Sequence, residues 1–187
     1  MRRIAEFLPL SLALLVILSV SGRVLGGQIS VIRPACVANI QPGDRSQGSR
    51  LIAKFDLSAV GTDRQIDFAK LIFSARIGAM EGAAAVVRLE VFPLTRDWEQ
   101  SAVGWNTPWS EPGGDIDSTE RSTNWVTVTN TPPLWLDVTR LARTWKAGER
   151  ANYGVLLKIS DLTPARFQTI DIGAVELKVW HHARSDP

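Results

Sequence analysis

Histidine and cysteine, the residues on which many metal and nucleophilic sites depend, are almost absent from this 187-residue sequence. The only histidines, His181 and His182, are adjacent near the C-terminus, where we expect a solvated tail after the last strand. A Ser-His-Asp arrangement would require one of them to fold back into a cleft, and a metal site would require further ligands beside them. The sequence therefore argues against histidine-dependent catalysis.

The single cysteine, Cys36, excludes an intramolecular disulfide. An apolar core must then hold the fold together, with or without a bound metal. We interpret Cys36 as a small buried residue, the alternative being a disulfide between two chains. Internal repeats, charge blocks and low-complexity linkers are also missing, so the sequence predicts one domain.

The N-terminus has the layout of a secretory signal peptide. Two arginines precede an apolar run from Phe7 to Val20, which ends at small and polar residues. We expect cleavage after Gly26, or alternatively near Gly22, and a secreted protein of the extracellular space or the periplasm. A retained membrane anchor is less favoured, because a proline and a serine interrupt a run shorter than the about 20 apolar residues of a spanning helix.

The slight excess of positive charge belongs to this predicted signal peptide, residues 1–26. The whole chain carries 21 Lys and Arg against 19 Asp and Glu, of which the signal peptide holds three and one. The predicted mature domain, residues 27–187, therefore balances at 18 of each (21 − 3 and 19 − 1). This balance indicates neither a nucleic-acid partner nor an anionic membrane.

Short segments with period-two alternation dominate the predicted domain. Apolar residues at every second position predict strands at 51–57, 71–77, 87–91, 134–138, 153–159 and 175–179. Many short strands separated by turn signals are typical of an antiparallel sandwich or barrel. The fold class is thus predicted to be all-β.

One segment follows a helical period instead. Val138, Leu141, Ala142 and Trp145 fall on one helical face, Asp137 or Thr139 can cap its start, and Gly148 can end it. We expect a single short helix across one end of the sandwich, with Trp145 in the core.

Five motifs occur along the chain in the order found in a known family. They are LIAKFDLS (51–58), FAKLIFSA (68–75), the segment TRDWEQSAVGWNTP (95–108), WLDVT (135–139) with Trp145 and Gly148, and NYGVLLK (152–158). This set resembles the DNRLRE domain, grouped with carbohydrate-binding module family 96. The resemblance covers roughly residues 51–180. It implies a secreted β-sandwich of jelly-roll type that binds glycans.

The sequence departs from the family in three respects. Only residues 28–50 precede the first motif, so we expect the family's first strand to be altered or lost. Gly104 stands where the family usually has threonine before the second tryptophan. The family's domain is often attached to larger enzymes or surface proteins, whereas we expect this one to stand alone.

The long connection 95–133 combines tryptophans with acidic residues, which favours a working loop. Its carboxylates are Glu99, Glu111, Asp115, Asp117 and Glu120. Solvated turn residues or calcium ligands are commoner roles for such a cluster than an acid/base pair. A structural calcium ion therefore remains open as a cofactor, although no spacing here forms a recognised ligand motif.

Tryptophan is the most informative residue type, because an indole offers a flat apolar face to a sugar ring and an N–H to a hydroxyl. Trp98, Trp105 and Trp145 lie in the family motifs and are predicted core anchors. Trp180 is expected on a sheet surface. The predicted ligand-binding tryptophans are Trp109, Trp125 and Trp135, although each alone is more often packed than exposed.

Arginine supplies the predicted polar contacts. Arg121, with Arg76 and Arg88, is suited to uronate or sulfate groups of an acidic ligand. The leading hypothesis is a non-catalytic module that binds a polysaccharide or surface glycan. The alternative is a structural or assembly module that contacts cell-surface or matrix proteins, and an enzyme acting on polysaccharide comes third.

Overall fold

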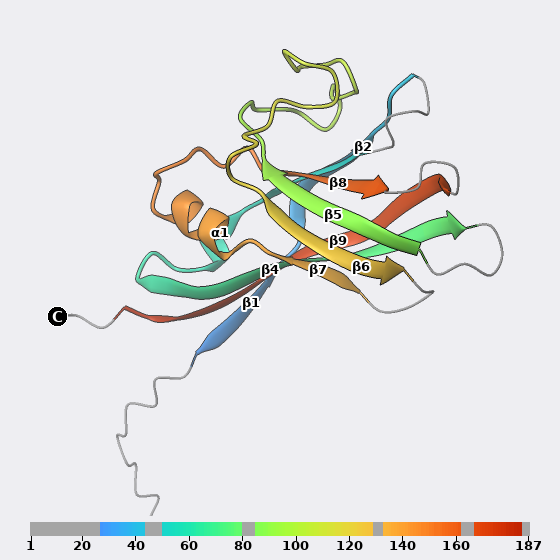
Figure 1. Cartoon of the computed structure of the whole chain (residues 1–187). Coiled ribbons are helices and arrows are strands. Elements are labelled where there is room, and N and C mark those ends of the chain that lie inside the picture. The colour runs from blue at the N-terminus through green and yellow to red at the C-terminus, as the bar shows by residue number, and fades with distance from the viewer. Residues whose placement is uncertain (1–26, 44–49, 80–84, 129–132, 162–166, 185–187) are drawn as a thin grey trace, which may run out of the picture.

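The computed structural model describes residues 27–43, 50–79, 85–128, 133–161 and 167–184. Nine strands form two antiparallel sheets that face each other (Figure 1). The four-stranded sheet has the order β1 (Gln28–Ile32), β9 (Phe167–Ala183), β4 (Arg64–Ala79) and β7 (Leu134–Asp137). The five-stranded sheet has the order β2 (Pro34–Ile40), β3 (Arg50–Phe55), β8 (Val155–Asp161), β5 (Ala85–Pro93) and β6 (Ser122–Val128). The predicted all-β sandwich is confirmed.

The strand pairing follows the nested pattern of a jelly roll. The outermost pair joins β1 to β9, the next joins β3 to β8, then β4 pairs with β7, and β5 pairs with β6. Successive pairs alternate between the two sheets, and β2 adds one further strand at the edge of the five-stranded sheet. The first and last strands of the chain thus form the outermost pair, and strands from its middle form the innermost pair.

The main core fills the space between the sheets. Alternation in β3 sends Leu51, Ala53 and Phe55 inward, where they pack with inward residues of β4, β5 and β9. The short helix α1 (Thr139–Lys146) closes one end of this core with Trp145, 7 % exposed. The predicted helix and the predicted core position of Trp145 are both confirmed.

The C-terminal end of α1 is formed as the sequence predicted, whereas Val138 is the residue at the N-cap position and makes no side-chain cap bond. Asp137 Oδ1 accepts hydrogen bonds from the backbone N–H and the hydroxyl of Thr139, at 2.8 and 2.6 Å. Gly148 lies beyond the last turn with a positive φ of 72°, a conformation that costs glycine little. Its N–H donates to the carbonyl of Trp145. Both devices satisfy backbone groups that a helix terminus leaves unpaired.

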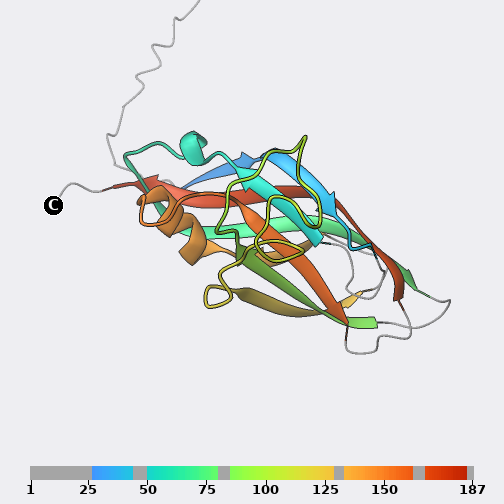
Figure 2. The same ribbon diagram turned by 90° about the horizontal axis from the view of Figure 1, so that it is seen from above.

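A second core lies on the outer side of the five-stranded sheet. Ile52, Leu156 and Phe92 point outward from β3, β8 and β5, yet each is buried. The connection between β5 and β6 covers them with Trp98 and Trp109 (Figure 2). Much of this sheet is therefore buried on both faces, and the predicted loop has a structural role that its sequence did not reveal.

Three strands and the histidines differ from the predictions. Residues 28–40, where we expected a strand to be altered or lost, form β1 and β2, and β6 lies within the predicted loop 95–133. His181 and His182 are part of β9 and do not form a solvated tail. Cys36 is half-buried and has a free thiol. The predicted signal peptide, 1–26, lies outside the described residues.

Candidate functional site

The four predicted ligand-binding residues do not form one site. Trp109 is only 7 % exposed, because its ring packs in the second core and its Nε1–H donates to the carbonyl of Gly104 at 2.8 Å. The prediction that Trp109 is exposed was wrong. Trp125 and Trp135 are exposed by 49 % and 42 %, but they lie on the outer faces of different sheets. Arg121 lies on the same side as Trp125, next to Glu90 of β5.

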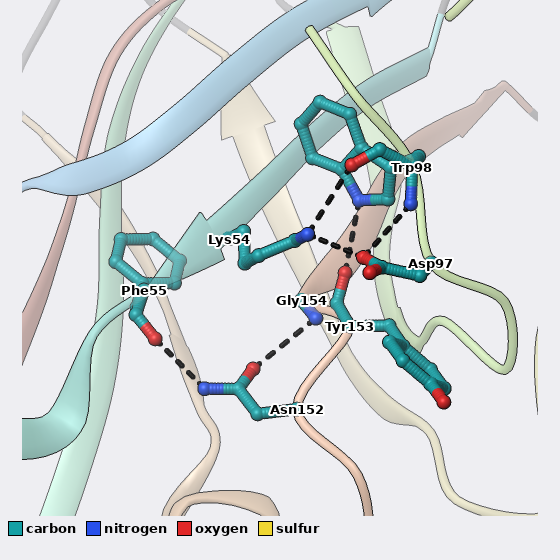
Figure 3. Close-up of polar contacts among 7 residues, drawn as sticks. All are labelled: Lys54, Phe55, Asp97, Trp98, Asn152, Tyr153 and Gly154. Atoms are coloured by element: carbon teal, nitrogen blue, oxygen red, sulfur yellow. Dashed lines mark hydrogen bonds and ion pairs between the residues drawn. The ribbon is translucent and has the colours of Figure 1, made fainter.

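The covering connection is fixed to the sheet at its first tryptophan (Figure 3). Trp98 is 3 % exposed and donates its Nε1–H to the carbonyl of Tyr153 at 2.9 Å. Lys54 of β3 forms an ion pair with Asp97 and donates to the carbonyl of Trp98. These bonds come from Lys54 of β3 and from Tyr153, just before β8, so the start of the connection has a defined position on the five-stranded sheet.

Trp105 belongs to the same layer but is only half-buried. The guanidinium of Arg50 lies 4.6 Å from the centre of its ring and donates to the carbonyl of Gly113 at 2.6 Å. Trp105 is therefore a partial anchor of the covering layer, whereas the predicted core position of Trp98 is confirmed in full.

Three of the five carboxylates of the connection, Asp115, Asp117 and Glu120, are bound by protein partners. Asp115 accepts hydrogen bonds from the backbone N–H of Ser110 and forms an ion pair with Arg96 at 2.9 Å. Asp117 accepts from Thr119 and from Arg150 at 2.7 Å, and these bonds lower its pKa to about 2. Both side chains hold the layer in place.

These carboxylates fit a calcium site poorly. Calcium takes six to eight oxygen ligands that converge on one point. Glu120 is bound to Arg140 at 2.7 Å, and the carboxylates of Asp115 and Asp117 are directed to different arginines. In the parts of the chain that the structure describes, no group of three or more His, Cys, Asp or Glu side chains is placed to hold a metal ion.

A buried carboxylate with three basic neighbours lies on the outer face of the five-stranded sheet. Glu90 of β5 is 2 % exposed, and its Oε2 accepts a hydrogen bond from Ser160 of β8 at 2.8 Å. The surrounding cations are Arg88 at 3.4 Å, Lys158 at 3.6 Å and Arg121 at 3.8 Å. We call these five residues the Glu90 cluster. One negative and three positive charges leave it with a net charge of +2.

Strand register places these side chains on one surface. Glu90 pairs with Lys158 of β8, and in the next row Arg88 lies between Ser160 and Trp125 of β6. Residues directly opposite in an antiparallel ladder point to the same face. The Arg88 guanidinium lies 5.7 Å from the centre of the Trp125 ring. An exposed indole therefore borders a basic patch whose centre is a buried acid.

The other predicted arginine, Arg76, has a side chain outside the described part of the structure. Glu90, Lys158 and Ser160 were missed by the sequence analysis. The alternation of Arg88 and Glu90 against buried Val87 and Leu89 does place the two charges on one face, and this was the available signal. The approach of Lys158 and Arg121 depends on the strand order and could not be read from the pattern.

The histidines are bound within the four-stranded sheet. His181 is 3 % exposed and its Nε2 lies 2.9 Å from the hydroxyl of Ser30 in β1. His182 contacts Asp67 through Nδ1 at 2.7 Å. Burial lowers the pKa of His181, since desolvation disfavours the charged imidazolium. His181 thus contacts a residue of β1, and His182 contacts a residue of β4.

No family model and no curated protein matches the chain. The resemblance to the DNRLRE domain therefore stays a prediction. Within the described residues no helix has the length and apolar character needed to cross a bilayer.

Proposed function

We propose that this protein is a secreted, non-catalytic carbohydrate-binding module and that its ligand site is the Glu90 cluster together with Trp125. The observation that carries the proposal is the half-exposed indole of Trp125 beside a patch of net charge +2. A sugar ring stacks on such an indole, and the neighbouring guanidinium groups bind a carboxylate or sulfate in two-point fashion. The preferred ligand is thus an acidic polysaccharide or surface glycan.

Glu90 supports this role by ordering the cations. Three basic side chains close together would repel one another and spread into solvent. The buried carboxylate holds Arg88 and Lys158 on the sheet, while Arg121 stays 56 % exposed and available to a ligand. The site is therefore arranged before the ligand arrives, which reduces the entropy cost of binding.

The environment of the acidic and histidine side chains favours binding over catalysis. Asp115 and Asp117 are bound to arginines, and His182 is bound to Asp67. An acid/base pair needs two carboxyl groups that face one another across a substrate. The jelly-roll scaffold and the predicted signal peptide are consistent with a module that acts outside the cytoplasm.

Affinity electrophoresis in gels containing polygalacturonate, dextran sulfate or neutral dextran tests the proposal. We expect retention by the two acidic polymers, weakened by salt, and little by neutral dextran. Trp125→Ala and Arg121→Gln should each weaken retention roughly three- to tenfold. Arg140→Gln is the matched control, because Arg140 is exposed and bound to a single acid, Glu120. Unchanged retention in both site variants, or none on any polymer, would refute the proposal.

The alternative is an assembly module, and the edge of the four-stranded sheet favours it. Strand β1 lies at this edge, and its Ile29 and Val31 are exposed by 55 % and 53 %. An exposed apolar edge strand is a template for pairing with a strand of another protein. Ile29→Lys should then abolish a concentration-dependent oligomer or a matrix-protein complex in sedimentation experiments, and should leave intact the retention that depends on Trp125 and Arg121.

A further inference from the structure

The outer face of the four-stranded sheet carries clustered aromatic side chains. Phe68 and Lys70 of β4 alternate with buried residues and point outward. Trp180 of β9 is opposite Phe68, with the two ring centres 5.4 Å apart. Trp135 of β7 is 42 % exposed on the same face. With Lys178 of β9, these residues form what we call the Lys70 platform.

The ammonium group of Lys70 lies among three aromatic rings. Its Nζ is 3.9 Å from the ring centre of Trp135, 5.1 Å from that of Phe68 and 5.8 Å from that of Trp180. The two indole centres are therefore at most 9.7 Å apart (3.9 + 5.8). Two indoles within this upper limit are close enough to contact sugars of the same polysaccharide strand. Each cation–π contact also favours a fixed position for the lysine.

The charges of the platform favour an anionic ligand. Lys70 and Lys178 are directly opposite in the ladder, an arrangement of like charges that destabilises a sheet. Asp137, the ladder neighbour of Lys70 on the other side, directs its Oδ1 to Thr139. No ion pair of either lysine with an acid occurs among the described residues. A bound carboxylate or sulfate would relieve the repulsion.

We propose that the Lys70 platform is a second binding site for an acidic polysaccharide, so that one domain holds two strands at once. The sugar faces stack on Trp135 and Trp180, and their acidic groups contact Lys70 and Lys178. The platform and the Glu90 cluster lie on the outer faces of opposite sheets, so a single strand does not connect them directly. The bivalent role rests on the proposed function, whereas the platform is testable by itself.

A second copy of the chain and an anionic membrane fit this face less well. Two copies that pack these faces together around a two-fold axis would bring their lysine rows close to one another. Membrane binding is favoured by apolar side chains that insert between lipids. The exposed Ile29 and Val31 of β1 border the platform, but the rings of the platform itself lie around an ammonium group. The polysaccharide uses both the rings and the charges.

The seven tryptophans give indole N–H signals that report each face separately in ¹⁵N-labelled protein. We expect polygalacturonate to shift the signals of Trp125, Trp135 and Trp180, and neutral dextran to shift none of them. Lys70→Gln should weaken the response of Trp135 roughly three- to tenfold and leave that of Trp125 unchanged. Arg121→Gln should do the reverse. Wild-type protein should also raise the viscosity of the polymer solution, and either variant should abolish this increase while it still binds.

Four outcomes would overturn this inference. Silent Trp135 and Trp180 signals at a polymer concentration that saturates Trp125 would leave the proposed function intact and remove the second site. A response at the platform without one at Trp125 would remove bivalency and the assigned Glu90 site instead. Suppose that the wild-type protein binds vesicles with 30 % phosphatidylserine, that Lys70→Gln does not, and that the polymer shifts no platform signal. This result would identify the platform as a membrane-binding surface. A dimer that dissociates on Trp135→Ala would identify a second copy.

Discussion

Replacement of Glu90 by glutamine should weaken the fold and strengthen the binding of polyanions. The change keeps the shape of the side chain and its bond to Ser160 but removes an acid that is bound to three cations. At a separation near 3.6 Å, each pair is worth about 1 kcal/mol in a water-like medium and about 4–5 kcal/mol at an effective dielectric constant of 20.

The expected loss lies near the lower of these limits. Arg88, Lys158 and Arg121 are 38 %, 35 % and 56 % exposed, so solvent screens each attraction. About 0.5–1 kcal/mol for each of three pairs gives roughly 1.5–3 kcal/mol of unfolding free energy. The net charge of the cluster meanwhile rises from +2 to +3, and we expect this added attraction for polyanions to exceed the entropy cost of losing the order that Glu90 imposes on the cations.

Urea unfolding with and without sodium sulfate measures the first effect, and affinity electrophoresis measures the second. Sulfate should stabilise Glu90→Gln more than wild type, since it replaces the missing negative charge. The control is Glu120→Gln, which breaks an ion pair with the 81 % exposed Arg140 and should cost less than about 0.5 kcal/mol. If Glu90→Gln unfolds at the wild-type urea concentration and its sulfate dependence is unchanged, the electrostatic reasoning is wrong.

Three further predictions concern the fold. Gly154→Ala should lower the unfolding free energy by about 2–4 kcal/mol in urea titration. The reason is that φ is 93° at this position and a Cβ would lie 2.2 Å from the Ala53 carbonyl oxygen. A loss below about 1 kcal/mol would contradict this. Asp117→Asn should lower the Tm at pH 7 but not at pH 2. A carboxylate whose pKa is lowered to about 2 stabilises the fold above pH 4 and loses that effect as the pH falls toward 2. Equal effects on the Tm at both pH values would refute the role of its bond to Arg150. The lowered pKa of His181 means that the unfolded chain binds the proton more readily, so Tm should fall as pH drops below about 6.5, and His181→Gln should flatten this part of the profile.

Period-two alternation predicted the strands that line the main core and the edge strand β7, but it missed the edge strands β1, β2 and β6. In β1 the apolar Ile29 and Val31 face solvent while Ser30 faces His181, so the alternation predicts the wrong face of this strand as buried. β6 is rich in polar residues because it is an edge strand with an exposed face. Alternation is informative only where one face is apolar and the other solvated.

The candidate site was only partly predictable for a related reason. Trp109 and Trp125 occur in the same stretch of sequence, and composition alone gives no means to separate the buried ring from the exposed one. The separation depends on Ile52 and Leu156, whose outward apolar side chains need a cover. The two charges of β5 were visible as a pattern, whereas their partners come from strands assembled by the topology.

The covering segment between β5 and β6 has a consequence for attempts to shorten or redesign the protein. A variant that replaces residues 95–118 with a tight turn would keep every strand but uncover Ile52, Phe92 and Leu156. Such a contiguous apolar surface favours self-association. The covering segment is thus part of the packed structure, and foreign sequences are better inserted elsewhere. Amides of β3 and β8, enclosed by side chains on both faces, should be among the slowest to exchange with deuterium.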